Sequence, residues 1–199
     1  MIFRNHPLGR NILGRPDLLK KFRSEDAMAF TSRFYQPSNM VFFVLGDFNF
    51  QKIVRQVEKL LVDLPLVTVE NQRTIPPLYV PEQLVVHKET HQAHVMIGSR
   101  GYNAYDDKRT ALYLLNNILG GPGMNSRLNV SLRERRGLVY TVESNLTSYT
   151  DTGAFCIYFG TDPEDVDTCL KLTYKELKRM RDVKMTSSQL ICLLYTSPS

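Results

Sequence analysis

Residues 120–140, GGPGMNSRLNVSLRERRGLVY, decide the fold of this chain. Four turn residues open the stretch, and Asn125 or Ser126 is a suitable N-cap for a helix that runs to about residue 136. Gly137 ends that helix, because glycine readily adopts the left-handed conformation that follows a last helical turn. An extended run comes next. The stretch therefore predicts a loop, a helix and a strand in succession.

Two side chains in this stretch are candidates for chemistry. Arg133 lies near the end of the helix, and Tyr140 follows seven residues later at the start of the strand. Taken singly, the arginine is a favourable charge at a helix C-terminus, and the tyrosine is an ordinary strand residue. As a pair, they could place two hydrogen-bond donors at the edge of a cleft and stabilise charge that develops on a carbonyl.

The turn Gly120–Gly123 has a second interpretation as a phosphate cradle at a helix N-terminus. It lacks the Lys-Ser/Thr ending of a P-loop, and it follows a predicted helix rather than a strand. We therefore expect a close-approach or mobile turn.

The composition predicts a globular protein of one or two domains. Of its 199 residues, 43% are hydrophobic and 23% are charged, and the longest apolar runs are far too short for a membrane span. The net charge of +5 is spread along the chain, without the interleaved basic and aromatic residues of nucleic-acid binders. We expect neither a membrane nor a nucleic acid as a partner.

Four residues of zinc-binding types, His87, Glu89, His91 and His94, lie within eight positions. In a strand, residues three apart point to opposite faces, and the chain contains neither HExxH nor HxxEH. A polar hairpin edge is the favoured interpretation. The three cysteines have no short spacing, which indicates small buried side chains rather than disulfides or a zinc ribbon.

Apolar patterns predict strands and helices on both sides of a proline-rich segment. Helices are expected from Ser24 to before Pro37, over 50–64, 106–119 and 125–136, and through 166–177, and strands at 40–45, 84–87, 95–99, 139–148 and 153–160. The two blocks repeat the order of apolar strand, Gly-Asp or Gly-Thr-Asp turn, and amphipathic helix. This repetition predicts an α+β fold of two related domains, each with helices packed on a mainly antiparallel sheet.

The domain boundaries follow from the prolines between residues 65 and 81, which indicate a semi-rigid linker. We expect residues 1–65 to be the C-terminal half of a first, incomplete domain, 66–82 the linker, and 83–190 a second domain. Residues 191–199 look like translated adapter sequence, and we assign them no function.

Several short motifs, in this order, resemble the M16 (pitrilysin-type) zinc peptidases and the related mitochondrial processing peptidases. The motifs HPLGR (6–10), YQPSNM (35–40) and Gly46-Asp47 are similar to the latter half of the family's first domain. The motifs GGPGMNSRL (120–128), LR (132–133), GLVY (137–140) and GAF (153–155) resemble its second domain. The resemblance covers nearly the whole chain. It is specific because these motifs occur together and in this order, not because of any one motif.

The resemblance implies that active relatives hold zinc on an HxxEH motif and a distal Glu of the first domain, upstream of the position of His6. It implies no catalytic residue and no metal ligand in the chain as written, which looks truncated. Arg133 and Tyr140 match the family's substrate-binding Arg and Tyr, and Gly120, Gly121 and Gly123 match its substrate-contacting Gly-rich loop. It also implies a clamshell chamber, formed by pairing of two M16-type chains as a homo- or heterodimer.

From this resemblance we expect a fragment of a bacterial, zinc-dependent M16-type metalloendopeptidase that hydrolyses small or unfolded peptides. The chain would supply the substrate-binding second domain and be inactive alone. The alternative is a non-catalytic structural or regulatory M16-like subunit that partners an active peptidase, and an in-frame HxxEH upstream of Met1 would distinguish the two. A basic nucleic-acid binder is a third and weaker alternative. The compartment, cytoplasmic or periplasmic, is not predicted.

Overall fold

The computed structural model describes residues 1–63 and 73–196. The chain divides into two compact units: residues 10–74 form the smaller one, and residues 1–9 join residues 75 onward in the larger one. This division falls inside the segment 66–82 that the sequence predicts as a linker. Residues 73–82 contain no helix or strand, and residues 66–72 of the predicted linker lie outside the described residues.

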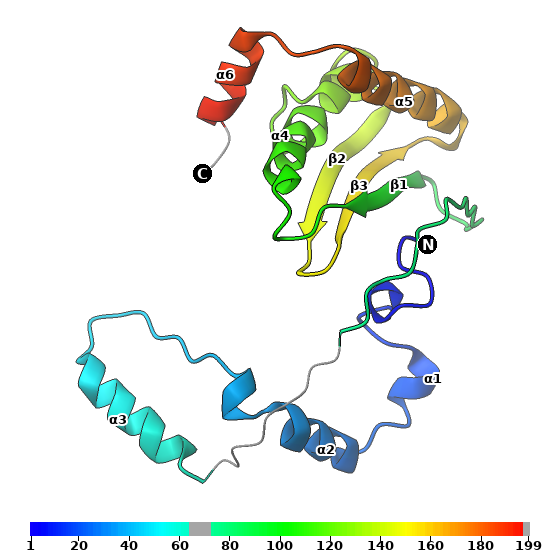
Figure 1. Cartoon of the computed structure of the whole chain (residues 1–199). Coiled ribbons are helices and arrows are strands. Elements are labelled where there is room, and N and C mark those ends of the chain that lie inside the picture. The colour runs from blue at the N-terminus through cyan, green and yellow to red at the C-terminus, as the bar shows by residue number, and fades with distance from the viewer. Residues whose placement is uncertain (64–72, 197–199) are drawn as a thin grey trace. The chain divides into compact units, whose positions relative to one another are not determined.

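The larger unit is a three-stranded antiparallel sheet with helices packed on one face (Figure 1). The strand order is β1-β3-β2, so β3 lies in the centre and pairs with both neighbours. The strands are β1 (Ala93–Gly101), β2 (Val139–Ser148) and β3 (Gly153–Thr161). The helical elements are α4 (Lys108–Gly120), the π-helix η3 (Asn129–Glu134), the 3-10 turn η4 (Pro163–Asp165), α5 (Val166–Asp182) and α6 (Ser187–Thr196). This arrangement confirms the predicted α+β fold.

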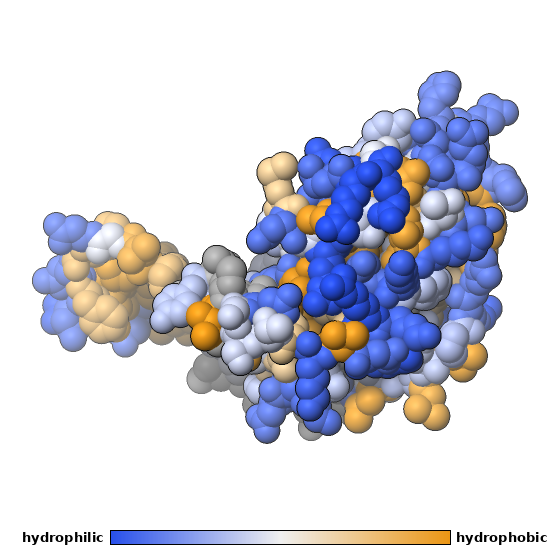
Figure 2. All heavy atoms as spheres, turned by 90° about the horizontal axis from the view of Figure 1, so that it is seen from above, coloured by the Kyte–Doolittle hydropathy of each residue, from blue (hydrophilic) through white to orange (hydrophobic). Residues whose placement is uncertain are grey.

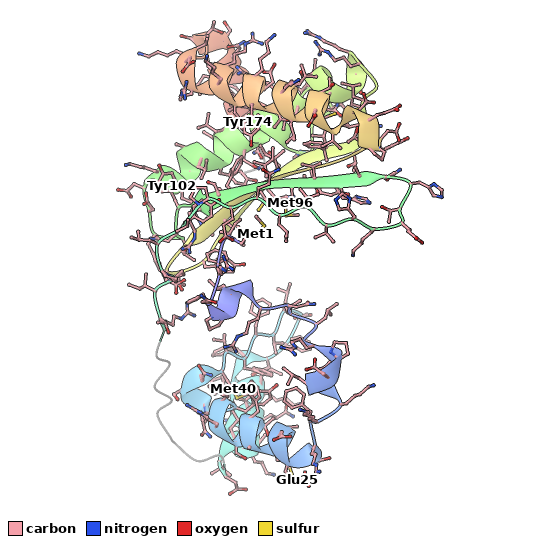
Figure 3. The ribbon with its side chains drawn as sticks, turned by 90° about the vertical axis from the view of Figure 1, so that its right-hand side faces the viewer. Met1, Glu25, Met40, Met96, Tyr102 and Tyr174 are labelled. Atoms are coloured by element: carbon pink, nitrogen blue, oxygen red, sulfur yellow. The ribbon has the colours of Figure 1, made fainter. Side chains whose placement is uncertain are left out.

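The core lies between the helices and the sheet, because alternate strand residues point to opposite faces. Ile157 and Phe159 of β3 are fully buried on the helical side. The other core residues come from α4, the position before η3, η3, β2 and α5: Leu119, Leu128, Leu132, Val139 and Cys169. Met96 of β1 points the other way and is 68% exposed. Figure 3 shows Met96 and Tyr174 of α5 on opposite sides of the sheet.

Part of the helix-free face is covered by the first residues of the chain. Phe3 is buried, lies 4.5 Å below the Arg100 guanidinium and meets the Tyr149 ring edge-on at 6.3 Å. Arg100 also donates hydrogen bonds to the carbonyl oxygens of Ile2, at 3.1 Å, and Pro77, at 3.0 Å. One arginine therefore attaches two distant segments to the end of β1, and no motif in the sequence indicates this contact.

The smaller unit contains helices and no strand in its described residues. The helices are α1 (Pro16–Leu19), α2 (Ser24–Phe34), the 3-10 turn η2 (Pro37–Asn39) and α3 (Phe50–Leu61). Helix α2 begins at Ser24, and the Asp26 carboxylate accepts the backbone N–H of Arg23 at 2.9 Å. The 3-10 turn η1 (Pro7–Gly9) belongs to the larger unit.

Two predicted strands are wrong. Residues 40–45 and 84–87 form no strand, although both are rich in residues that favour strands. A strand needs a hydrogen-bonded neighbour, and neither segment meets one among the described residues. Their side chains stay in solvent, with Val41 95% and Phe43 79% exposed.

The surface of the larger unit is mainly hydrophilic over its helical side, where α5 carries several Lys and Arg residues (Figure 2). Within the described residues, no helix combines the length and apolar character needed to cross a membrane.

The turn after η3 depends on one glycine. Gly137 has φ of +63°, and its backbone N–H donates to the Arg133 carbonyl at 2.7 Å. A Cβ placed there would have no described atom within 4 Å, so the cost of a side chain comes from the backbone conformation alone.

We expect Gly137→Val to lower the free energy of unfolding of the chain by about 1–2 kcal/mol. Gly137→Asn should cost less, because asparagine tolerates the left-handed region better than β-branched residues do. Urea unfolding followed by far-UV circular dichroism measures both values. Equal costs for the two variants would contradict this account of the turn.

Leu132 provides a test of the core. Its side chain is fully buried beneath the sheet, so we expect Leu132→Ala to lower the free energy of unfolding by about 2–5 kcal/mol. Arg135→Ala, at an exposed position one residue beyond η3, should change it by less than about 0.5 kcal/mol. A similar loss from both variants would show that the helix does not pack as described.

Candidate functional site

Arg133 and Tyr140 lie on either side of the Gly137 turn, and both side chains are exposed. The backbone around them is fixed by hydrogen bonds from outside the turn. The backbone N–H of Leu138 donates to the Leu132 carbonyl at 2.9 Å, and the buried Thr161 hydroxyl donates to the Leu138 carbonyl at 2.5 Å. The end of η3, the start of β2 and the end of β3 are therefore joined at one place.

The helix that carries Arg133 is a π-helix rather than the α-helix that the sequence predicts over 125–136. Residues 129–134 have π geometry, and the Arg135 N–H donates to the Val130 carbonyl, five residues earlier, at 3.1 Å. Ser131 and Leu132 are buried on its inner side, while Arg133 points outward. Short π segments of this kind occur often at functional sites.

The strand that carries Tyr140 has a β-bulge at that residue. Val139 pairs with Thr161 and Thr141 pairs with Gly160, so Tyr140 is the extra residue of β2. The bulge changes the alternation of the strand: Val139 is buried, Tyr140 and Thr141 are both exposed, and the core side resumes at Val142, which is half-buried. The tyrosine is thus directed outward at the edge of the sheet.

Tyr140 donates its phenolic proton to Asp162, at 3.0 Å between Oη and Oδ1. The hydrogen bond and the negative charge of the carboxylate both disfavour the phenolate and raise the pKa of Tyr140. A phenol has one proton to donate, so in this state Tyr140 cannot also donate to a substrate. The sequence analysis did not name Asp162 as a site residue. Its one indication in the sequence is the Gly-Thr-Asp turn, which repeats the Gly-Asp turn of the first block.

The Arg133 guanidinium has no hydrogen bond or ion pair with any residue of the described chain, and none joins it to Tyr140. Its five N–H donors are therefore free for a ligand. The structure fixes the two backbone positions relative to each other and leaves both side-chain ends accessible.

The three glycines proposed to contact substrate differ in exposure. Gly120 and Gly121 are buried. A Cβ on Gly120 would lie 2.8 Å from the Ser144 nitrogen, and one on Gly121 would lie 2.7 Å from the Asn117 Cα, so both are needed for close packing. Gly123 is exposed, and it is the one of the three that a ligand could reach without rearrangement.

No zinc site is found in the described residues. Nowhere among them do three His, Cys, Asp or Glu side chains gather where they could hold a metal ion. The predicted candidates are dispersed: His94 Nδ1 lies 2.9 Å from Tyr158 Oη, and His87, Glu89 and His91 belong to a segment without helix or strand. The residues present therefore do not fit a zinc centre.

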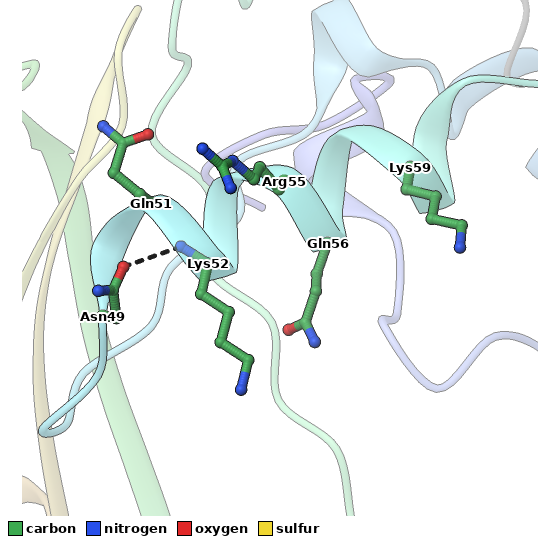
Figure 4. Close-up of a pocket in the computed structure, with 6 residues that line it drawn as sticks. All are labelled: Asn49, Gln51, Lys52, Arg55, Gln56 and Lys59. Atoms are coloured by element: carbon green, nitrogen blue, oxygen red, sulfur yellow. Dashed lines mark hydrogen bonds between the residues drawn. The ribbon is translucent and has the colours of Figure 1, made fainter.

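A hollow in the smaller unit runs along the exposed polar face of α3 (Figure 4). Asn49 caps this helix by accepting the Lys52 N–H at 3.1 Å. The hollow is lined by Asn49, Gln51, Lys52, Arg55, Gln56 and Lys59. It contains none of the predicted site residues, and a basic face on a single helix does not by itself form a binding site.

A protein-family model described as the peptidase M16 inactive domain matches residues 21–190. An uncharacterized zinc protease of Streptomyces coelicolor is 31% identical over 198 residues, which cover 95% of this chain and 42% of that protein. An uncharacterized zinc protease of Bacillus subtilis is 31% identical over 186 residues, covering 94% of this chain and 45% of that protein. The chain thus spans less than half the length of these curated relatives.

Solved structures share the fold. The peptidase M16 inactive domain from Pseudomonas fluorescens superposes on all of this chain and 49% of its own, with a TM-score of 0.83 and 24% identity. A protease from Helicobacter pylori matches 91% of this chain and 45% of its own, with a TM-score of 0.74 and 25% identity. With the family match over residues 21–190, these findings show that the chain belongs to the M16 peptidase family, in the region described as its inactive domain.

Proposed function

We propose that this chain supplies the substrate-binding surface of an M16-type zinc metalloendopeptidase that hydrolyses small or unfolded peptides, with the zinc held by residues outside this sequence. The observation that carries the proposal is the pair of exposed side chains, Arg133 and Tyr140, on one rigid turn. Relatives named as zinc proteases, each more than twice as long as the matched region, support it.

The chemistry of the two side chains suits a peptide backbone. An arginine has donors and no acceptor and is always charged, so Arg133 is matched to a peptide carbonyl. The Tyr140 phenol is small, rigid and amphipathic. Its hydroxyl can form a hydrogen bond with the next polar group of the same peptide backbone. Neither contact depends on a substrate side chain, which agrees with a site that takes unfolded polypeptides.

The smaller unit supports the proposal that a first domain is completed by residues outside this sequence. Its described residues bury the polar Gln36 but no large apolar side chain, and Val41, Phe42 and Phe43 are 95%, 65% and 79% exposed. An apolar extended segment of this kind is normally covered by neighbouring strands. Pairing of two such chains, as a homo- or heterodimer, would close a chamber around the peptide.

The first test uses the complete gene product and a quenched fluorescent peptide. We expect Arg133→Ala to lower kcat/KM about 10²- to 10³-fold, because removal of one donor to a reacting carbonyl has this effect in other hydrolases. Zinc content, measured by plasma mass spectrometry, should stay unchanged.

Arg135→Ala is the matched control, since it removes the same charge from an exposed position two residues away and should retain activity. Equal activity of the Arg133 and Arg135 variants would overturn the assigned role. A complete gene product without chelator-sensitive cleavage would instead favour the non-catalytic subunit.

The second test uses the 199-residue chain alone. We expect it neither to bind zinc stoichiometrically nor to cleave the peptide, because the described residues do not fit a zinc centre. Chelator-sensitive cleavage by the purified chain, after removal of contaminating peptidases, would contradict the proposal that the ligands lie elsewhere.

A further inference from the structure

We propose that Asp162 is a positioning residue for Tyr140 and that it turns the phenol so that the oxygen, rather than the proton, faces a bound peptide. The inference rests on the proposed function, because it assigns a role within the same peptide-binding surface. It adds a residue that neither the sequence nor the family match indicates.

Tyr140 and Asp162 lie next to the last residue pair that joins β2 to β3. Val139 pairs with Thr161 in these antiparallel strands. Tyr140 follows Val139 in β2 and Asp162 follows Thr161, the last residue of β3, so the two residues flank this pair diagonally. Thr161 is fully buried, and its hydroxyl holds the Leu138 carbonyl at 2.5 Å. Both backbones are therefore held in place next to the bulge, and the two side chains reach across the Val139–Thr161 pair to bring Tyr140 Oη within 3.0 Å of Asp162 Oδ1.

The Asp162 carboxylate does not cap the helical turn that follows it. It directly precedes η4, where an aspartate side chain commonly accepts backbone N–H groups, yet it makes no such capping bond. The Asp165 N–H donates instead to the Asp162 backbone carbonyl at 3.0 Å. The carboxylate reaches across to β2, and because the pair is exposed it adds little to stability. Its main physical effect is to orient the tyrosine.

Tyr140 and Arg133 differ in the hydrogen-bonding groups that they can offer to a ligand. With its proton directed at Asp162, the Tyr140 oxygen can still accept a hydrogen bond but cannot donate one. Arg133 has donors only. The two side chains therefore offer complementary groups, a donor for a peptide carbonyl and an acceptor for a peptide N–H. Two donors would satisfy only carbonyls, whereas this arrangement satisfies both polar groups of an extended backbone.

The test compares Asp162→Ala, Asp162→Asn and the matched control Glu164→Gln, an exposed acidic residue two positions later. In the complete gene product we expect Asp162→Ala to lower kcat/KM about 10- to 100-fold, as misplacement of a substrate-contacting group does. Asp162→Asn, which keeps an acceptor, should lose less, and Glu164→Gln should match the wild type. In a Tyr140→Phe background, Asp162→Ala should have no further effect, because a positioning residue acts through its partner.

A second readout is independent of catalysis. The chain contains 10 tyrosines, so the difference between the 295 nm titrations of the wild type and Tyr140→Phe isolates the ionisation of Tyr140. We expect the pKa of Tyr140 to lie above its ordinary value and to fall in Asp162→Asn. An unchanged pKa would show that the two side chains do not meet in solution.

The outcomes separate this inference from the proposed function. Loss of activity in Arg133→Ala together with wild-type or higher activity in Asp162→Ala would overturn the positioning role and leave the proposed function standing. Higher activity would mean that Asp162 competes with the substrate for the phenolic proton. Equal activity of Arg133→Ala and Arg135→Ala would overturn the proposed function itself. If Asp162→Ala and Tyr140→Phe lower kcat/KM additively, Asp162 acts independently of Tyr140 and has only a structural role.

Discussion

The arrangement of the larger unit depends on the buried threonine at the end of the central strand. Thr161 is fully buried, and its backbone pairs with Ala93 on one side and Val139 on the other. Its hydroxyl donates to the Leu138 carbonyl and lies 3.7 Å from the Cys169 sulfur of α5. One residue therefore ties all three strands to the turn before β2 and to the last long helix. A buried hydroxyl is tolerated because it is hydrogen-bonded.

This anchor explains how exposed residues can have defined backbone positions. Arg133 and Tyr140 have little packing of their own, since both are largely in solvent. Their backbones are nonetheless fixed, because Leu138 bonds to Leu132 on one side and to Thr161 on the other. The π geometry of η3 and the bulge at Tyr140 both lie next to this point. Each irregularity directs one side chain outward while its neighbours remain in the core.

The sequence predicted the elements whose partners lie within the chain. The alternation over 139–148 and 153–160 matches β2 and β3, and the helical spacing after Gly160 matches α5, because these segments bury one face against each other. The predicted strand over Met40–Leu45 did not form, since apolar composition does not supply a hydrogen-bonded neighbour. Leu64, at the end of the predicted helix over 50–64, lies outside the described residues. The π-helix and the bulge leave no periodic signal, so pattern reasoning could not have found them.

The site residues were predicted by resemblance rather than by pattern, and this explains what was missed. The resemblance to a family motif makes Arg133 and Tyr140 candidates, but it does not give the hydrogen-bond state of the tyrosine. In the structure the Tyr140 hydroxyl donates its hydrogen bond to Asp162 Oδ1. Since the folded state raises the pKa of Tyr140 above the ordinary value of 10.0, the contribution of this bond is fully present at neutral pH and is lost only as pH rises through that raised pKa. Tyr140 therefore stays protonated and able to donate this bond at neutral pH. In the proposed function, a fixed donor at 133 and a fixed acceptor at 140 recognise groups that every peptide carries, so any preference among substrates has to come from other surfaces of the chamber.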